Sequence, residues 1–232
     1  MTKQINVLLI CIWMGLGLLS PTIIRAQGFF WGQTGYVMLG PTQLNLPVMN
    51  QFLESEDFPL MSERPFSMEL GFSVYRQNWV MGANLNNFMS AQSRFQASRQ
   101  ALVSLNYQYL NLYVGRILYR KDINFAFYPT VGIAGGGAVL KYQPLGSRFP
   151  ENYWTAGGFV NGALNFSWYP PFPEAPLQRL HLGFSIGYNH ALDQIPNSWR
   201  INNLAPDKFI PVEPTGPYIK IIFGMGKVKR RY

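Results

Sequence analysis

The chain has 232 residues, of which 48% are hydrophobic, 16% aromatic and only 13% charged. A soluble domain usually carries about 25% charged residues, so this composition argues against an ordinary soluble domain. The formal net charge of +8 is spread along the chain except in the tail KVKRRY (227–232), and we therefore expect no nucleic-acid partner.

The first residues have the features of a secretory signal peptide. Lys3 supplies a positive start, an apolar run covers 5–20, and AQG offers a cleavage site. At about 16 residues the run is short for a membrane helix, which needs about 20. The sequence therefore predicts a signal peptide at 1–26 and one exported domain at 27–232, with an uncleaved anchor as the alternative. The only cysteine, Cys11, falls inside the run.

Eight segments of the exported part alternate large apolar residues with small or polar ones, as strands do. They are expected at about 29–40, 67–76, 79–90, 101–119, 125–141, 153–168, 180–189 and 217–228. Soluble strands have about 5–6 residues, whereas strands that cross a membrane have about 9–11, which suits these lengths better. A short helix is expected near Val48–Leu53, in the first long connection.

The clearest segment is LHLGFSIGYN (180–189), in which the alternation holds at every position. Its polar face, like that of most of the other segments, carries Gly, Ser, Asn, Thr and Gln rather than the charges of a free surface. Such residues suit the interior of a filled barrel, with the apolar face toward lipid. Aromatic residues on the apolar face near strand ends are typical of the membrane interfaces. They are Trp79, Tyr119, Tyr153, Trp154, Trp168, Tyr188 and Tyr218.

The fold class predicted is an all-β, eight-stranded antiparallel transmembrane up-and-down β-barrel. Connections after the first, third, fifth and seventh segments are longer than those after the second and fourth, which matches long outer loops and short periplasmic turns. In lipid every backbone group must be paired, so the strands have to close on themselves. Eight strands close around an interior filled by side chains.

Charged residues on the inward parity form a candidate interior network. Glu69 and Arg116 are placed there by counting, on the assumption that Tyr107, Tyr109 and Tyr113 face outward. His181 and Lys220 are expected to join them. Buried charges must be paired to be tolerated. The network is either a structural plug or part of a gated pore or proton path.

The connections contain the other candidate sites. In the last long connection, Trp199 beside Arg200 resembles an interaction hot spot. His190, Asp193 and Ser198 lie close in sequence, but they lack the His-x-Ser spacing of lipid-modifying barrel enzymes. We expect no catalytic residues and no cofactor, because no nucleophile, base and orienting group converge in the sequence. We also expect no metal, because two His residues and no cysteine in the exported part make no ligand cluster.

The segments NLYVGRILYR (111–120) and INFAFYPTVGIAGGGAVLKY (123–142) resemble uncharacterised Bacteroidota outer-membrane barrel proteins. More broadly, the chain is similar to small outer-membrane barrels of Gram-negative bacteria with OmpA/OmpX-like architecture. The resemblance implies a location in the cell outer membrane. The chain departs from that pattern at its end, where Lys229, Arg230 and Arg231 precede the terminal aromatic Tyr232.

The function expected is therefore non-enzymatic: a structural or interaction role, displaying loops or serving as an accessory subunit. Its expected partners are outer-membrane lipid and, through the loops, other envelope proteins. A narrow, porin-like channel or transporter for small solutes is one alternative. A lipid-modifying enzyme and a soluble secreted ligand-binding barrel are the others.

Overall fold

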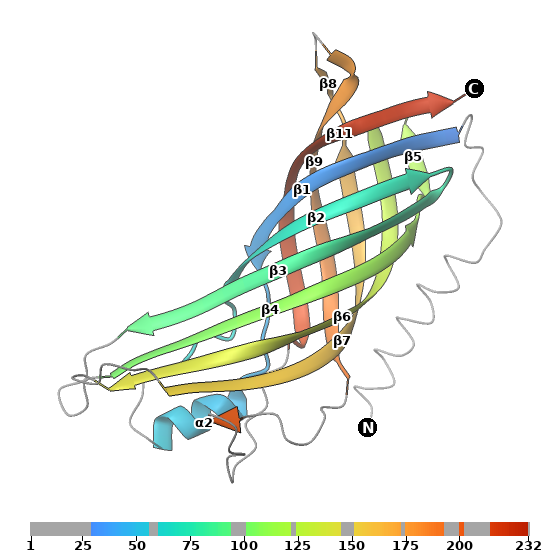
Figure 1. Ribbon diagram of the computed structural model, residues 1–232. Coiled ribbons are helices and arrows are strands. Elements are labelled where there is room, and N and C mark those ends of the chain that lie inside the picture. Colours follow the sequence, from blue (N-terminus) through green and yellow to red (C-terminus); the bar gives the residue numbers. More distant parts are fainter. Residues whose placement is uncertain are drawn as a thin grey trace.

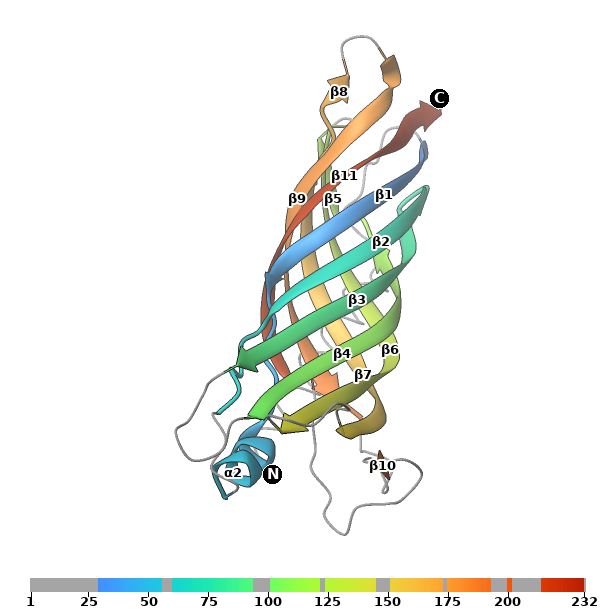
Figure 2. The same cartoon turned by 60° about the vertical axis from the view of Figure 1, so that its left-hand side comes forward.

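Figures 1 and 2 show a computed structural model of the chain, in which the strands wrap around one closed barrel. The structure describes residues 29–55, 60–93, 101–121, 124–144, 151–172, 175–192, 200–201 and 214–231. The predicted signal peptide lies outside these ranges.

Eight long strands form the wall, and all eight segments predicted from the sequence are confirmed. They are β1 (Phe29–Pro41), β2 (Phe66–Arg76), β3 (Trp79–Ser93), β4 (Ala101–Arg116), β6 (Phe125–Pro144), β7 (Glu151–Trp168), β9 (Ala175–Ala191) and β11 (Gly216–Arg231). Each pairs antiparallel with the next along the chain, and β11 pairs with β1 to close the ring. In the described ranges, no helix is long and apolar enough to cross a membrane.

The register of the pairs fixes how steeply the strands run. A path from Gly32 through successive paired residues passes once around the wall and returns to β1 at Thr42, ten positions farther along. Strand number and this stagger together determine the tilt, which in barrels is about 35–45°. The steep tilt is visible in Figure 2.

The two ends of the barrel differ, and we name them by what they carry. The terminal end holds the start of β1 and the end of β11, together with the short strands β5 (Tyr119–Lys121) and β8 (Pro171–Phe172). The loop end holds the connections after β1, β3, β6 and β9, of which the first and last are long, and the helix α2 (Pro47–Ser55), which contains the helix predicted at Val48–Leu53. The strand β10 (Arg200–Ile201) pairs with β7 at this end.

Side chains of β9 alternate as the sequence predicts. Phe184 and Ile186 are 40% and 45% exposed on the outer face, while His181 and Ser185 are buried inside. The same assignment is correct for β2, where Leu70 is exposed and Glu69 is buried. The outer wall is therefore apolar over most of its height.

The prediction for β4 was wrong. Tyr107 and Tyr109 point inward and are buried, and Leu110 and Leu112 are about half exposed on the outer face. Tyr218 of β11, also predicted to face outward, is 9% exposed and points inward. In β4 the reason is that the loop end of the interior is filled with aromatic and aliphatic side chains, while Tyr218 lines a cavity of the central layer. An inward position therefore does not always hold a small polar residue.

Candidate functional site

The barrel interior is arranged in three layers along its axis. An apolar cluster fills the loop end, a polar layer fills the centre, and a second cluster rich in tyrosine fills the terminal end. The buried polar side chains of the central layer come from all eight wall strands. They include Glu69, Asn84, Asn86, Asn111, Thr130, Asn161, Asn165, Ser185, Asn189 and Lys220, with Tyr36 from β1.

At the centre Glu69 of β2 and Lys220 of β11 form an ion pair. Both side chains are almost wholly buried, and β1 lies between their strands. Asn84 donates to the second carboxylate oxygen of Glu69 at 3.1 Å, and Tyr109 donates to the first at 3.0 Å. Asn86 also donates to Glu69. The carboxylate is therefore held by four donors, as a charge buried away from water requires.

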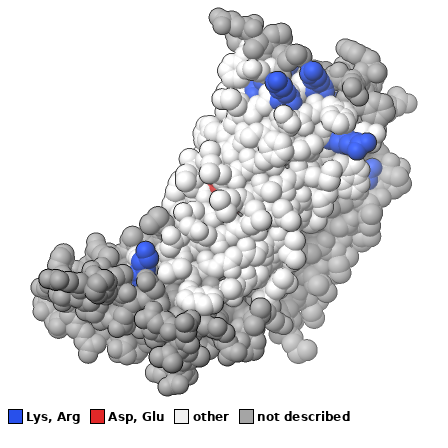
Figure 3. Space-filling model, in the orientation of Figure 1, with Lys and Arg blue, Asp and Glu red and all other residues white. Residues whose placement is uncertain are grey.

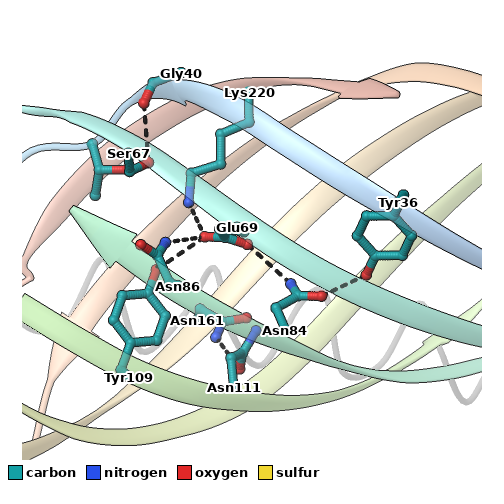
Figure 4. A network of polar contacts seen from close by, with 11 residues as sticks. Tyr36, Gly40, Ser67, Glu69, Asn84, Asn86, Tyr109, Asn111, Asn161 and Lys220 are labelled. Carbon is teal, nitrogen blue, oxygen red and sulfur yellow. Dashed lines mark hydrogen bonds and ion pairs between the residues drawn. The ribbon is translucent and has the colours of Figure 1, made fainter. Parts of the chain in front are cut away.

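The ion pair continues into a chain of neutral hydrogen bonds, part of which is drawn in Figure 4. The Tyr36 hydroxyl donates to the Asn84 side-chain oxygen at 2.5 Å and lies 2.7 Å from the Tyr113 hydroxyl. Tyr113 in turn lies 2.5 Å from the Ser73 hydroxyl. Nearby, Asn161 donates to Asn111 at 2.6 Å. Contacts of this kind join β1, β2, β3 and β4 across the lumen, which favours one fixed interior arrangement.

His181 lies between the central layer and the terminal end. Its Nε2 is 2.9 Å from the Ser167 hydroxyl, and its ring stacks on Tyr169 at 4.8 Å between centroids. Its Nδ1 has no hydrogen-bond partner among the described residues. The ring borders a cavity of about 30 Å³ that Tyr36 and Asn161 also line. A cavity of this size has room for one or two water molecules.

The loop end is closed by the first connection of the chain. Leu44, Leu46, Leu53 and Met61 are almost wholly buried against Leu105, Tyr107, Tyr109, Leu140 and Phe159 of the wall. Hydrogen bonds fix the connection in place. Leu44 N donates to Glu63 O at 2.7 Å, and the Asn50 side chain both donates to Met61 O and accepts from Met61 N. We call the described residues of this connection, 42–55 and 60–65, which include α2, the plug.

The terminal end is closed by Tyr169, the residue that follows β7. Its hydroxyl donates to Tyr75 at 2.7 Å, and its carbonyl accepts from Arg179 at 3.1 Å. Burial raises the pKa of Tyr169 well above the usual value of 10.0, so the phenol stays neutral. Arg179 also donates to Asn124 at 2.6 Å. Tyr169, at the start of the connection from β7 to β9, therefore points inward and covers the opening.

The predicted network is present only in part. The structure brings Glu69 and Lys220 together and places His181 in the interior, but it does not bring Arg116 to them. Arg116 is the last residue of β4 and lies outside, with its guanidinium 6.0 Å from the centre of the Trp79 ring. The parity of β4 is the reverse of the predicted one, which is why its arginine was placed inside.

Sequence reasoning missed the asparagines and Tyr109 as partners of Glu69. A usable signal existed, since Asn84, Asn86, Asn111, Asn161 and Asn165 share the inward parity of their strands. It also missed Tyr169, because the length of the turn gave no sign that one residue would enter the barrel.

The proposed loop sites fall largely outside the described residues. Trp199 lies outside them, and of Arg200 only the backbone is described, paired with Trp154. Of the possible enzyme set, Asp193 and Ser198 also lie outside, while His190 is the second-last residue of β9. Among the described residues, no group of three or more His, Cys, Asp or Glu could hold a metal ion.

No protein-family profile and no curated protein matches this chain. Its structure is similar to that of Ail, the attachment invasion locus protein of Yersinia pestis, crystallised in complex with the heparin analogue sucrose octasulfate. That match has a TM-score of 0.45 and 11% identity over 88% of this chain and 99% of the other. A second Ail structure gives a TM-score of 0.38 and 14% identity over the same shares.

Neisserial surface protein A, NspA, matches with a TM-score of 0.37 and 8% identity over 87% of this chain and 99% of its own. Ail and NspA are small eight-stranded outer-membrane β-barrels. At such low identity the likeness concerns the fold and says nothing of what this chain binds. The resemblance to Bacteroidota proteins stays a prediction.

Proposed function

We propose that this protein is an integral barrel of the outer membrane that does not conduct, and that it has a structural or interaction role rather than an enzymatic one. The observation that carries the proposal is the combination of an apolar outer wall with an interior closed at both ends. A soluble barrel would have the opposite arrangement, with charged residues outside.

The height of the apolar wall supports a membrane location. On β4, the outward residues Leu110, Leu112 and Val114 lie between polar Gln108 and charged Arg116. The eight steps from Gln108 to Arg116 span about 27 Å along the strand, or about 20 Å once the tilt is allowed for. The apolar band of outer-membrane barrels is about 25 Å tall.

The filled interior argues against a channel. A pore needs a continuous path, and the described interior has the plug at one end, Tyr169 at the other and the Glu69–Lys220 pair between them. The protein then acts through its surfaces. Its proposed partners are outer-membrane lipid along the wall and other envelope proteins at the loop end.

Fractionation of cells expressing the chain, followed by electrophoresis with and without boiling, tests the membrane proposal. We expect recovery in the outer membrane and a mobility shift on heating. Recovery in solution without a shift would contradict it and favour a secreted ligand-binding barrel. Recordings in planar lipid bilayers test the proposal that the barrel does not conduct. We expect no single-channel conductance.

Surface labelling tests which end is outside. The one native cysteine lies in the predicted signal peptide, so an introduced cysteine would be the only thiol of the exported domain that can react. We expect an impermeant maleimide to label Ser62→Cys, in the plug, on intact cells. Pro171→Cys, at the terminal end, should react only after the membrane is permeabilised. The reverse pattern would contradict the proposed orientation.

A further inference from the structure

We propose that the outer wall over β1 holds a binding site for one anionic glycerophospholipid, with the headgroup at the terminal end and an acyl chain in a groove at Gly35. The site rests on the proposed membrane location and adds a ligand class to it. It is formed by three successive outward positions of β1 and their neighbours on the flanking strands.

The first row of the site is cationic and aromatic. Trp31 of β1 is paired with Lys229 of β11 on one side and Arg76 of β2 on the other. All three side chains are exposed, and the guanidinium of Arg76 lies 5.8 Å from the centre of the Trp31 ring. Arg and Lys are the side chains that bind phosphate groups, and tryptophan prefers the headgroup level of a bilayer.

The second row adds donors one step nearer the middle of the wall. Gln33 of β1 is paired with Lys227, which is itself paired with Gln178 of β9. Lys227 and both glutamines are exposed. Neighbouring strands lie about 4.8 Å apart, so the three cations of the two rows lie within reach of one headgroup.

The third row contains a gap between bulky side chains. Gly35 is paired with Met225 on one side and Phe72 on the other, and Leu180 stands beyond Met225. A β-carbon added at Gly35 would meet no atom within 4 Å. Gly35, Met225 and Leu180 line an open groove of about 550 Å³ in the wall, together with Val37, Leu70 and Phe223.

The spacing of the rows fits one lipid molecule. From Trp31 to Gly35 the strand advances about 14 Å, and its tilt makes the change in depth smaller. The groove therefore lies below the cations within the apolar band, where acyl chains begin. An apolar groove alone would accept any lipid, and the cations above it select an anionic one.

The charge around the site supports that selection. Lys and Arg gather at the terminal end, above a wall almost free of charge (Figure 3). Of the acidic side chains that are described, Glu54 and Glu63 belong to the plug at the other end and Glu69 is buried. The described part of the terminal end therefore has no carboxylate to compete with a lipid phosphate.

Native mass spectrometry of the folded protein tests the site. The protein, released from detergent micelles, is titrated with phosphatidylglycerol or with phosphatidylcholine of the same acyl chains. We expect one phosphatidylglycerol to be retained, at least tenfold more tightly than phosphatidylcholine. Arg76→Gln and Lys229→Gln should each weaken phosphatidylglycerol retention about fivefold without affecting phosphatidylcholine.

Gly35→Leu fills the groove and should reduce retention of both lipids. Matched controls exist on the opposite side and end of the barrel. Gly135 of β6 is also exposed in open space, and Lys141 is an exposed cation at the loop end, so Gly135→Leu and Lys141→Gln should change nothing.

Equal retention of the two lipids by the wild-type protein, or equal effects of the site and control variants, would overturn the inference. The heat-dependent mobility shift is recorded on the same samples. A shift with no lipid preference overturns the site alone, whereas a protein that shows no shift overturns the membrane proposal and the site with it.

Discussion

The centre and the loop end of the barrel are both closed, but by different chemistry. The centre is closed by side chains of the wall strands themselves, joined through Glu69 and Lys220. The loop end is closed by a separate segment, the plug, which packs Leu44, Leu46 and Leu53 onto the wall. Removing central contacts should therefore weaken the whole barrel, while removing plug contacts should release one segment and leave the wall folded.

The largest effect is expected at the central ion pair. Glu69→Gln leaves the Lys220 ammonium buried without a carboxylate, and should lower the free energy of unfolding by about 3–5 kcal/mol. This free energy is measured by urea unfolding in detergent micelles, with the heat-dependent mobility shift as the readout of the folded fraction. The double variant Glu69→Leu with Lys220→Met should lose clearly less, because no uncompensated charge remains. A double variant that loses as much as the single variants Glu69→Leu and Lys220→Met added together would show that the charges are not coupled.

The next effect separates the plug from the wall. Leu53 of α2 is 1% exposed, and Leu53→Ala removes most of its contact with the apolar cluster. We expect a loss of about 2–4 kcal/mol, confined to the plug. Limited proteolysis should then cut within 42–65, while the urea midpoint of the wall stays unchanged. Glu54→Ala, at an exposed position of the same helix, is the control. A lower wall midpoint in Leu53→Ala would contradict the separation.

A smaller effect is expected at the polar contact inside the plug. The Asn50 side chain holds both backbone groups of Met61, at 3.2 Å and 2.9 Å. Asn50→Ala leaves these groups without that partner and should destabilise the plug by about 1–2 kcal/mol. Asn50→Asp keeps the acceptor for Met61 N and should lie between Ala and wild type. Protease sensitivity measures all three, and equal sensitivity of Asp and Ala variants would show that the acceptor contributes nothing.

The contrast between the two regions also explains which parts of the fold were predictable. Strand alternation in β9 reports its orientation correctly because its inward residues, such as Ser185 and Asn189, belong to the polar centre. In β4, by contrast, Tyr107 and Tyr109 reach the apolar cluster at the loop end, where large side chains face inward. Only the middle of β4 has polar residues inside and apolar residues outside, with Asn111 inward and Leu110 and Leu112 outward.

The candidate site was predictable to a similar extent. A lone carboxylate and a lone ammonium on inward parity, Glu69 and Lys220, require each other in any filled barrel, so their sequence pattern is informative. Arg116 has the same chemistry but stands at a strand end, where the outer face meets headgroups and charge is tolerated. The plug was not predictable as a lid, because a helix in a long connection does not reveal what it covers.

The smallest effect returns to the centre and tests whether its neutral part behaves like its charged part. The Tyr113 hydroxyl lies 2.7 Å from the Tyr36 hydroxyl and 2.5 Å from that of Ser73. Tyr113→Phe removes both contacts but keeps the ring, so the loss should be about 1 kcal/mol. A cycle with Ser73→Ala isolates one contact: if the network is coupled, Ser73→Ala will cost less in the Phe background than in the wild type. Urea unfolding of the whole wall is the measurement. Strictly additive losses would mean that the Ser73 and Tyr113 hydroxyls act independently, so that the neutral contacts at this point are not coupled as the Glu69–Lys220 pair is expected to be.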